Sequence, residues 1–535
     1  MERFDAEYDY VVVGAGSAGC VIANRLSARS EIRVLLLEAG PKDANPWIHI
    51  PVGYYRTMDD PRINWGYRTE PDLAGRRFDW PRGKVLGGCS SINGLVYARG
   101  QAEDFDHWRQ LGCTGWSYDD VLPHFRRAER AAMEGLDDGY HGSDGPLSVT
   151  RASAHPLCDA YIEAATQAGI PANRDYNGRS QEGAGYFHVT TRNGWRSSAA
   201  TAYLRPARRR RNLDIQTGRH VRRLIVDKRR VTGLEVDGKT GPQIIRARRE
   251  VVLSAGAINS PQILQLSGIG HGEVLKSHGI TVEQHLPEVG RNLQDHFTCS
   301  SKYRCALPVT VNDEAGSFVG QVRSALRWLK DRDGPMSLSA GQVGVFAKTS
   351  PDVATPDVQF HFLRFTAAKR GRKLDPFPGF TVTMCQLRPE SRGYVRIASA
   401  DHRDPPSIQP NYLAEAKDRE VMIAGMKLVR QVAGQPALKD YIAEELVPGL
   451  DVQSDEAMLD YIRNNGSSIF HPSSTCRMGA DNGAVVDPRL TVNGIDGLRV
   501  ADASIMPTLV SGNTNAGCIM IGEKAASLIL EDLQA

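Results

Sequence analysis

Short apolar runs alternate with one helical repeat in the first forty residues. Tyr10–Val13 is a continuous apolar run rich in valine, and Val34–Leu37 is a second run that ends at Glu38. Such runs are typical of strands buried on both faces of a parallel sheet. Between them, the apolar residues of Cys20–Leu26 recur with helical spacing. The pattern predicts a strand, a helix and a second, parallel strand.

The turn before this helix carries three glycines, Gly14, Gly16 and Gly19. Gly14 allows a tight turn, Gly16 lets the backbone approach a pyrophosphate, and Gly19 lets the helix pack close to the strand. The helix N-terminus offers N–H groups to phosphates, and Glu38 can accept hydrogen bonds from ribose hydroxyls. An acid at that strand tip disfavours a 2′-phosphate, so FAD or NAD is preferred to NADP.

A second glycine-rich segment runs from Arg82 to Gly94. Its residues suit either a surface loop or backbone that passes close to a phosphate or a planar ring, and the residues alone leave both open. Residues 250–257 form a further strand that leads into a glycine turn and a helix. This segment predicts a second return of the chain to the nucleotide-binding sheet.

The pattern changes between about residues 300 and 465, where alternating segments replace glycine loops. Residues 358–363 and 380–384 alternate like strands, and residues 420–428 and 458–463 have helical spacing. We therefore expect an antiparallel sheet backed by helices. His361 is interpreted as a sheet residue, and Phe360 and Phe362, which alternate with it, are assigned to a substrate pocket.

Composition narrows the class of protein. The 535 residues carry a net charge of +3, with 41% hydrophobic and 24% charged residues, as in multidomain globular proteins. Disordered, collagen-like and disulfide-scaffold proteins are excluded, and the charge gives no reason to expect nucleic acid. Nine scattered cysteines without a CxxC pair indicate reduced thiols in a cytoplasmic protein. We expect no signal peptide and no transmembrane segment, while peripheral contact with the inner membrane stays open.

The densest basic run is Arg208 to Arg211. We interpret it as a solvated face. The alternative is contact with an anionic membrane surface or with an electron-accepting partner.

Four ordered segments resemble the glucose-methanol-choline (GMC) family of flavoprotein oxidoreductases. They are the N-terminal glycine fingerprint, Arg82 to Gly100, Ser254 to Gly270, and Phe470 to Lys524. The resemblance spans nearly the whole chain and implies an α/β (α+β) protein. A Rossmann-like FAD-binding domain would comprise residues 1–160, 200–300 and 465–535. A substrate-binding domain, built on an antiparallel sheet backed by helices, would comprise residues 161–199 and 301–464.

Oxidation of an alcohol through a flavin needs a base at the hydroxyl and a second group that orients the oxygen. By resemblance, His471 is the base and Asn513 is its partner, since imidazole titrates in the right range. Asn515 is interpreted as a neighbour that shapes the pocket or contacts the flavin. His296 is interpreted as a polar loop residue rather than a catalyst. The expected substrate pocket is formed by Phe360, Phe362, Phe470, His471 and Asn513.

The resemblance also assigns the cofactor contacts. FAD is expected to be non-covalent, because Ile92 stands where some relatives carry a flavin-linked histidine. Asp502 ends a strand and suits a ribityl hydroxyl, with a plain helix cap as the alternative. The residues expected to contact FAD are Gly14, Gly16, Ser17, Ala18, Gly19, Glu38, Ala39, Trp65, Arg82, Val85, Gly87, Gly88, Ser90, Asn93, Gly94, Val96, Val221, Ala255, Gly256, Asp502, Ala503, Asn513, Thr514 and Asn515.

The predicted reaction is oxidation of a primary alcohol, polyol or sugar to the carbonyl, with hydride transfer to flavin N5 and electrons passed to a quinone-like acceptor. Oxygen as acceptor is one alternative; a flavin-containing lyase of the hydroxynitrile-lyase type and an NAD-dependent enzyme are the others. Choline is not favoured, because the sequence locates no acidic or aromatic cage for a quaternary ammonium. No metal site is expected, and the sequence leaves the oligomeric state open.

Overall fold

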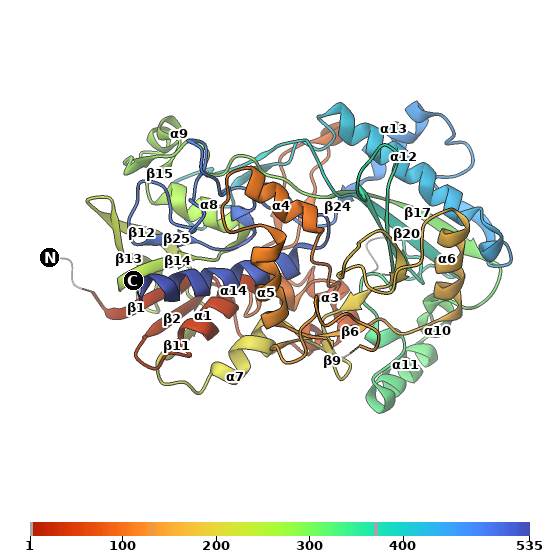
Figure 1. Ribbon diagram of the computed structural model, residues 1–535, viewed down its shortest axis with the longest axis horizontal. Coiled ribbons are helices and arrows are strands. Elements are labelled where there is room, and N and C mark those ends of the chain that lie inside the picture. The colour runs from red at the N-terminus through yellow and green to blue at the C-terminus, as the bar shows by residue number, and fades with distance from the viewer. Residues whose placement is uncertain (1–3, 132, 369–372, 535) are drawn as a thin grey trace.

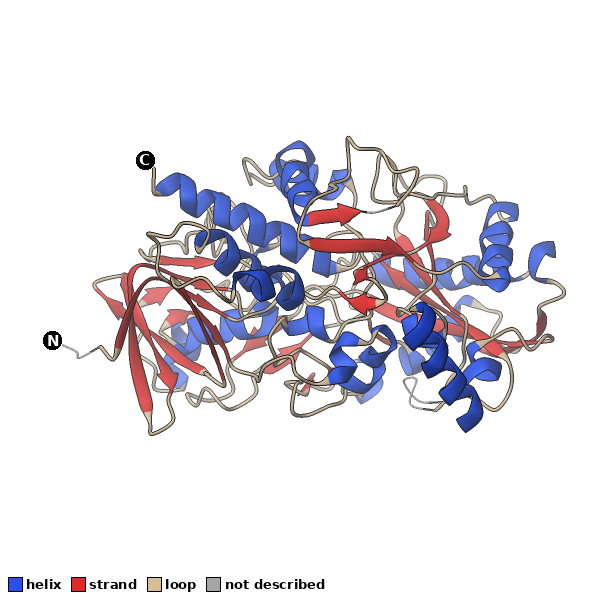
Figure 2. Cartoon of the chain, turned by 90° about the horizontal axis from the view of Figure 1, so that it is seen from below, coloured by secondary structure: helices blue, strands red, loops and turns tan. Residues whose placement is uncertain are grey.

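Two sheets, each with its own hydrophobic core, lie along the long axis of the molecule (Figures 1 and 2). The computed structural model describes residues 4–131, 133–368 and 373–534. The first sheet is near the N-terminus, at the left of both views, and the second is at the right. The predicted α/β class is confirmed.

The first sheet has the strand order β11-β2-β1-β14-β13-β12, with β25 paired to β14. β11, β2, β1, β14 and β25 run parallel, whereas β12 and β13 add an antiparallel hairpin. Segments far apart in the chain therefore meet in one sheet. The bounds are β1 Ala6–Val13, β2 Val34–Glu38, β11 Leu213–Thr217, β12 Val221–Asp227, β13 Arg230–Asp237, β14 Pro242–Leu253 and β25 Leu498–Val500.

The turn from β1 into α1 (Ser17–Leu26) is as tight as the glycines predicted. Gly14 has φ = 97°, and a Cβ there would lie 2.5 Å from the carbonyl oxygen of Ser254. A Cβ on Gly19 would overlap the carbonyl oxygen of Gly14. Only glycine fits both positions, because α1 packs directly on the turn. The predicted strand–helix–strand unit is confirmed.

The second sheet has the order β23-β17-β20-β19-β18-β7, with β24 paired to β17, and every pairing is antiparallel. Helices α6, α12 and α13 cover one of its faces, with α12 packed on β20 and on α6. α6 crosses the predicted boundary at residue 160, and its buried residues belong to this second core. The bounds are β7 Gly183–Tyr186, β17 Phe297–Cys305, β18 Val343–Ala347, β19 Val358–Leu363, β20 Gly379–Gln386, β23 Ile442–Val447, β24 Ser467–Ser468, α6 Pro156–Gln167, α12 Ala416–Ala433 and α13 Asp455–Asn465.

The C-terminal helix α14 (Thr514–Asp532) packs against α1 and against α5 (Tyr118–Ala128), as Figure 1 shows. The fully buried carboxylate of Glu523 holds it there. Arg25 donates two hydrogen bonds of 2.7 and 2.8 Å, and the Tyr203 hydroxyl donates one of 2.9 Å. Arg127 adds an ion pair at 2.8 Å. These contacts hold the middle of α14 against the last turn of α1.

The other elements are shorter or peripheral, and within the described ranges no helix is both long and apolar enough to cross a bilayer. All nine cysteines are free thiols. The remaining helices are α2 Pro46–His49, α3 Tyr54–Thr57, α4 Ala102–Gln110, α7 Arg205–Ala207, α8 Gly256–Leu266, α9 Gly272–Ser277, α10 Val311–Ala315 and α11 Phe318–Asp331. The remaining strands are β3 Tyr67–Arg68, β4 Asp79–Trp80, β5 Glu129–Ala131, β6 Leu147–Arg151, β8 His188–Val189, β9 Thr191–Arg192, β10 Trp195–Arg196, β15 Ile269–Gly270, β16 Gln284–His285, β21 Tyr394–Arg396 and β22 Ser407–Gln409.

Candidate active site

A cavity of about 1420 Å³ runs between the two sheets. The glycine turn after β1, the tip of β2 and the start of α14 line it from the first domain. Strands β17, β19 and β20 and helices α10 and α11 line it from the second. The cavity therefore joins the predicted nucleotide site to the predicted catalytic residues.

At the nucleotide end, backbone rather than side chains forms the cradle. A Cβ on Gly88 would lie 2.7 Å from the Cα of Gly16, so two glycine loops touch through bare backbone. Beside Gly16 and Gly256 the space is open: a Cβ on Gly16 would meet only the Ser254 oxygen at 3.9 Å, and one on Gly256 would meet nothing within 4 Å. Both glycines line the cavity. An open surface of backbone at two helix N-termini fits a bound pyrophosphate.

Glu38 closes the tip of β2 and lines the same cavity. Its carboxylate accepts hydrogen bonds from the N–H groups of Ala15 (3.0 Å) and Gly40 (2.8 Å). Burial raises the pKa of Glu38 to about 7, although these two N–H groups act in the opposite direction. The carboxylate therefore holds the glycine turn in place and still presents lone pairs to a ribose hydroxyl.

The structure divides the predicted cofactor contacts into two groups. Four do not line the cavity and support the loops instead: Gly87 N–H donates to Ala15 O (2.7 Å), Ser90 Oγ donates to Gly87 O (2.6 Å), Val85 lies in a small core, and Gly19, within α1, packs on the turn at Gly14. Those that line the cavity are Gly14, Gly16, Ser17, Ala18, Glu38, Ala39, Trp65, Arg82, Gly88, Asn93, Gly94, Val96, Val221, Ala255, Gly256, Asp502, Ala503, Asn513, Thr514 and Asn515.

Asp502 joins the glycine turn at the start of α8 to the turn that follows β25. Its Oδ2 accepts from Gly256 N–H (2.8 Å) and from Ser260 Oγ (2.6 Å), and its Oδ1 accepts from Ser504 N–H (2.8 Å). Asp502 thus caps the short helix that follows it, which was the alternative to a cofactor contact, and it also lines the cavity. Nearby, Ser17 Oγ donates to Asn515 Oδ1 (2.8 Å), which joins the first turns of α1 and α14.

His471 sits on a loop pinned by Asp295. Asp295 accepts a hydrogen bond from the N–H of His471 (2.6 Å) and from the hydroxyls of Ser468 and Tyr412. Burial raises the pKa of Asp295 to about 6, against the lowering effect of these donors. Phe470 adopts φ = 69°, a left-handed conformation that costs a non-glycine residue on the order of 1 kcal/mol or more. Such strain persists only where the surrounding contacts hold it.

A chain of hydrogen bonds determines which nitrogen of His471 carries the proton. His296 Nε2 lies 3.0 Å from the carbonyl oxygen of Leu387, which can only accept, so Nε2 donates. The Nδ1 of a neutral His296 then accepts, and it lies 2.9 Å from His471 Nδ1, which must donate. His471 Nε2 is therefore left without a proton. Burial lowers the pKa of His296 to about 4 and that of His471 well below 6.5, so both rings are neutral.

Asn513 completes this arrangement. Gln359 Nε2 on β19 donates to Asn513 Oδ1 (3.2 Å), which turns the Asn513 amide N–H₂ toward His471 Nε2 (3.2 Å). Asn513 precedes α14, and its side chain does not cap that helix. The result is an unprotonated imidazole nitrogen beside an amide donor, both at the cavity wall.

Sequence reasoning missed three residues of this site. His296 was interpreted as a loop residue, yet it is buried and contacts His471. Gln359 was not considered. His361 is a sheet residue of β19, as interpreted, but it also lines the cavity, and neither of its ring nitrogens has a hydrogen-bond partner among the described residues. Burial lowers the pKa of His361 to about 3, so the ring is neutral and can donate or accept toward a ligand.

The assignment of Phe360 and Phe362 to the substrate pocket is wrong. Both are fully buried in the second core, and Phe362 stacks on Tyr161 of α6 at 4.3 Å between ring centroids. Successive side chains of a strand point to opposite faces, so the face of β19 that meets the cavity carries His361 and Leu363 instead. Phe470 and His471 do line the cavity as expected.

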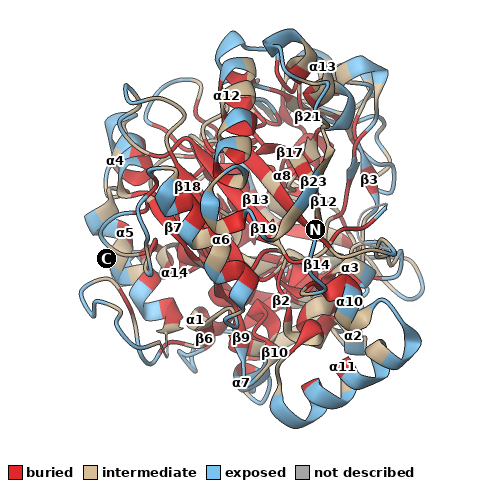
Figure 3. Ribbon diagram, turned by 90° about the vertical axis from the view of Figure 1, so that its right-hand side faces the viewer, coloured by how far each residue is buried: buried red, intermediate tan, exposed pale blue. Residues whose placement is uncertain are grey.

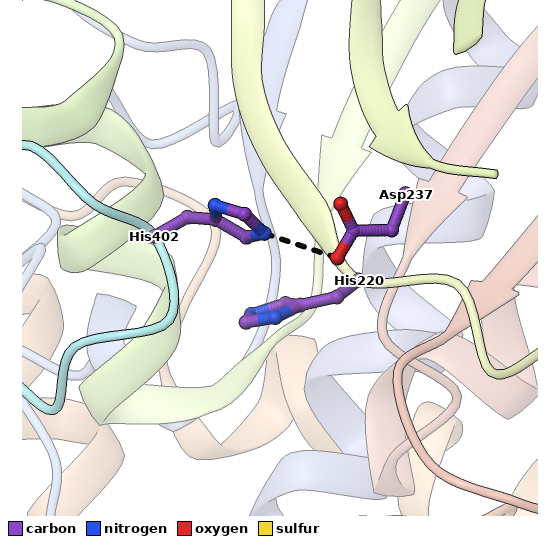
Figure 4. A group of neighbouring side chains, drawn as sticks. All are labelled: His220, Asp237 and His402. Carbon is purple, nitrogen blue, oxygen red and sulfur yellow. Dashed lines mark hydrogen bonds and ion pairs between the residues drawn. The ribbon is translucent and has the colours of Figure 1, made fainter. Parts of the chain in front are cut away.

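One group of side chains in the described ranges has the composition of a metal site: His220, Asp237 and His402 (Figure 4). Their candidate ligand atoms lie within 4.8 Å of one another. However, His402 Nε2 is hydrogen-bonded to Asp237 (3.1 Å), and Arg222 donates to the other oxygen of Asp237 (2.6 Å). The charge of the Asp237 carboxylate is thus already balanced by Arg222. The geometry is that of an arginine–aspartate ion pair to which His402 is hydrogen-bonded.

Comparisons with known proteins agree with this site. Two sequence models described as GMC oxidoreductase match residues 8–298 and 389–522. An oxygen-dependent choline dehydrogenase of Photobacterium profundum is 42% identical, covering 98% of this chain and 93% of its own. An alcohol dehydrogenase [acceptor] of Pseudomonas putida is 42% identical (98% and 96%), and human mitochondrial choline dehydrogenase is 44% identical (98% and 90%).

Among solved structures, pyridoxine 4-oxidase from Mesorbium loti matches with TM-score 0.88, 32% identity and coverage of 98% and 99%. Formate oxidase matches with TM-score 0.92, 26% identity and full coverage of both chains.

Proposed function

The chain belongs to the GMC oxidoreductase family, and on that premise we propose that it oxidises an uncharged alcohol to the carbonyl compound with His471 as the base. Enzymes of this family use FAD, and the open backbone at Gly16 and Gly256 fits its pyrophosphate. The bound cofactor supplies a hydride acceptor for the alcohol carbon. Ile92, at the cavity wall, offers no nucleophile for a covalent link, so we propose that FAD is dissociable.

The observation that carries the proposal is the protonation pattern at His471. The Nε2 of His471 lies at the cavity end of the hydrogen-bond chain and carries no proton. It can therefore accept the proton of a substrate hydroxyl. The Nδ1–H of His471 donates to His296 Nδ1, and this hydrogen bond holds the ring of His471 in that orientation. The Asn513 amide and the unpartnered ring of His361 are the donors that can orient the hydroxyl oxygen and the developing alkoxide.

The second sheet favours an uncharged substrate over choline. His361 pairs with Thr383, and Leu363 pairs with Thr381, which in turn pairs with Lys302 of β17. All five residues line the cavity, so an ammonium group lies on the same sheet face, one row from His361. The acids that line the described cavity are Glu38 and Asp502 at the nucleotide end and the exposed Asp59 after α3. A quaternary ammonium bound against this sheet face would share the cavity with the like charge of Lys302.

We further propose a quinone-like acceptor and a cytoplasmic location. One relative is named oxygen-dependent and another is named for an unspecified acceptor. Oxygen is therefore the alternative acceptor. The free thiols support a reducing compartment.

The decisive test is anaerobic reduction of the bound flavin by a panel of primary alcohols, polyols, sugars and choline, followed by reoxidation with oxygen or an artificial quinone. His471→Ala should retain FAD and slow flavin reduction by about 10²–10⁴-fold, the usual contribution of a general base. His278→Ala, at the remote end of α9, is the matched control and should reduce normally. Fast flavin bleaching by an alcohol in His471→Ala would contradict the assignment. No bleaching of the wild type by any alcohol would favour lyase chemistry.

A further inference from the structure

Helix α11 carries a large apolar surface that no described part of the chain covers. Figure 3 shows it at the lower edge of the molecule with its outer side exposed. Its exposed fractions are Phe318 80%, Val319 67%, Leu326 62%, Leu329 57% and Val322 44%. These five account for most of the large hydrophobic side chains that the described chain exposes.

The exposed residues form one continuous stripe. At about 100° per residue, Phe318, Leu329, Val322, Leu326 and Val319 follow one another around the helix within a sector of roughly 100°. Lys330, Arg323 and Arg327 occupy the next sector, also at the surface. An apolar sector bordered on its exposed side by cationic side chains is typical of a helix that lies in the interface of a membrane.

The opposite side of α11 is anchored in the protein. Trp328 is buried, donates to Gly194 O (3.2 Å) and meets Trp195 of β10 edge-to-face, at 4.5 Å between ring centroids. Ser324 on this inner side lines the cavity, and so do Gln321 and Ala325 at the flank between the inner side and the stripe. The helix is therefore a firm wall of the cavity, with its apolar stripe pointing away.

Other residues along the same edge match this orientation. α7 and α11 both lie at the lower edge of the molecule in Figures 1 and 3, and the exposed Arg208, Arg209 and Arg211 follow α7 directly. Trp195, 38% exposed, lies beside α11. Tryptophan is favoured at membrane interfaces, and arginine attracts anionic lipid headgroups.

We propose that α11 docks this protein on the surface of an anionic phospholipid bilayer, with Phe318, Val322, Leu326 and Leu329 inserted among the lipids and the basic residues on the headgroups. The docking does not depend on the alcohol chemistry. It would bring the α11 wall of the cavity to the lipid, where apolar substrates and quinone-like acceptors concentrate.

The test is flotation of the FAD-bound protein with vesicles of phosphatidylcholine alone and of phosphatidylcholine mixed with phosphatidylglycerol. The wild type should float with the anionic vesicles, less so at high salt because screening weakens headgroup contacts. Phe318→Ser/Leu326→Ser should bind at least about tenfold more weakly, since binding scales with buried apolar area. Arg323→Glu/Lys330→Glu should lose at least about fivefold per basic residue, on the anionic vesicles only.

Two variants serve as controls for these substitutions. Leu450→Ser removes another exposed leucine (75% exposed), and Lys276→Glu reverses a charge on α9, at the opposite end of Figure 1. Both should float like the wild type. Unchanged flavin absorbance and an unchanged far-ultraviolet circular dichroism spectrum would show that the α11 variants are folded, whatever the fate of the proposed reaction.

Three results would overturn the proposal. The first is a wild type that fails to float with anionic vesicles at low salt. The second is loss of flotation in Leu450→Ser equal to that in the α11 double variant. The third is a wild-type dimer that Phe318→Ser/Leu326→Ser converts to a monomer with flotation unchanged, because the stripe would then cover a second copy of the chain.

Discussion

At the scale of single residues, the site depends on which atoms of His471 and Asn513 are donors and which are acceptors. A carbonyl oxygen at Leu387 determines the tautomer of His296, which determines that of His471. Gln359 determines the orientation of the Asn513 amide. Groups that never need to touch the substrate thus decide whether the base is available.

The low pKa of His471 predicts the pH dependence of the reaction. Burial, and then the neighbouring His296, His361 and Arg82, lower the pKa of His471 well below 6.5. The proton-free base is present above its pKa and is lost as pH falls through it. The rate constant for anaerobic flavin reduction should therefore stay level from pH 8 to about pH 6.5 and fall only at lower pH. An acid limb centred at or above pH 6.5 in stopped-flow measurements would contradict this.

Gln359 is predicted to be a positioning residue. Gln359→Leu removes the donor to Asn513 Oδ1 and should slow flavin reduction by roughly 2- to 10-fold, as expected for one hydrogen bond of about 0.5–1.5 kcal/mol. The same change in an Asn513→Ala background should have almost no effect on that rate constant. Equal factors in both backgrounds, measured in a double-mutant cycle, would show that Gln359 acts independently of Asn513.

At the scale of elements, the nucleotide end depends on two loops that approach each other through glycine. Gly88 meets the backbone of Gly16 with no room for a Cβ on Gly88, and the N-termini of α1 and α14 are joined by Ser17 and Asn515. Retention of FAD should therefore be sensitive to a single methyl group at this contact.

Gly88→Ala tests this sensitivity. Its Cβ would lie 2.7 Å from the Cα of Gly16, which is backbone and cannot swing away. The variant should purify with little flavin, measured as the ratio of flavin to protein absorbance. Gly66→Ala is the matched control, because Gly66 also has a positive φ (68°) but open space around it. Equal flavin content in the two variants would show that the contact between a Cβ at position 88 and Gly16 does not control FAD retention.

At the scale of the whole molecule, α14 links the C-terminus of the chain to its N-terminal nucleotide unit. Glu523 is buried, and its carboxylate serves Arg25, Arg127 and Tyr203 together. Removing one member of a buried ion pair leaves the others unpaired away from water, which is costly.

Glu523→Ala should accordingly lower the free energy of unfolding by about 3–5 kcal/mol. Asp481→Ala breaks an exposed pair with Arg477 and should cost less than about 1 kcal/mol. Chemical denaturation followed by flavin release and circular dichroism would measure both. A loss in Glu523→Ala no larger than in Asp481→Ala would mean that packing, and not the carboxylate, holds α14.

Much of the nucleotide-binding half could be predicted because its requirements are local. A strand, a glycine turn and a helix occupy consecutive residues, and the sterics of Gly14 and Gly19 act within that unit. The identity of His471 and Asn513 came from the family resemblance rather than from periodicity. The class of the second sheet followed from alternation, but alternation alone does not tell which face is covered.

Only the tertiary structure decided the contacts between residues that are distant in the chain. His296 and His471 are 175 positions apart, and Gln359 and Asn513 are 154 apart. Helices α6 and α12 cover the Phe360 and Phe362 face of β19 and leave His361 at the cavity, so burial rather than residue type chose the lining. The stripe on α11 is likewise visible as amphipathic sequence, but only the packing of Trp328 shows which side of the helix stays exposed. Local steric requirements can be inferred from residues that are adjacent in the sequence. The tautomer of a histidine, the covered face of a strand and the exposed side of a helix depend on contacts with distant parts of the chain.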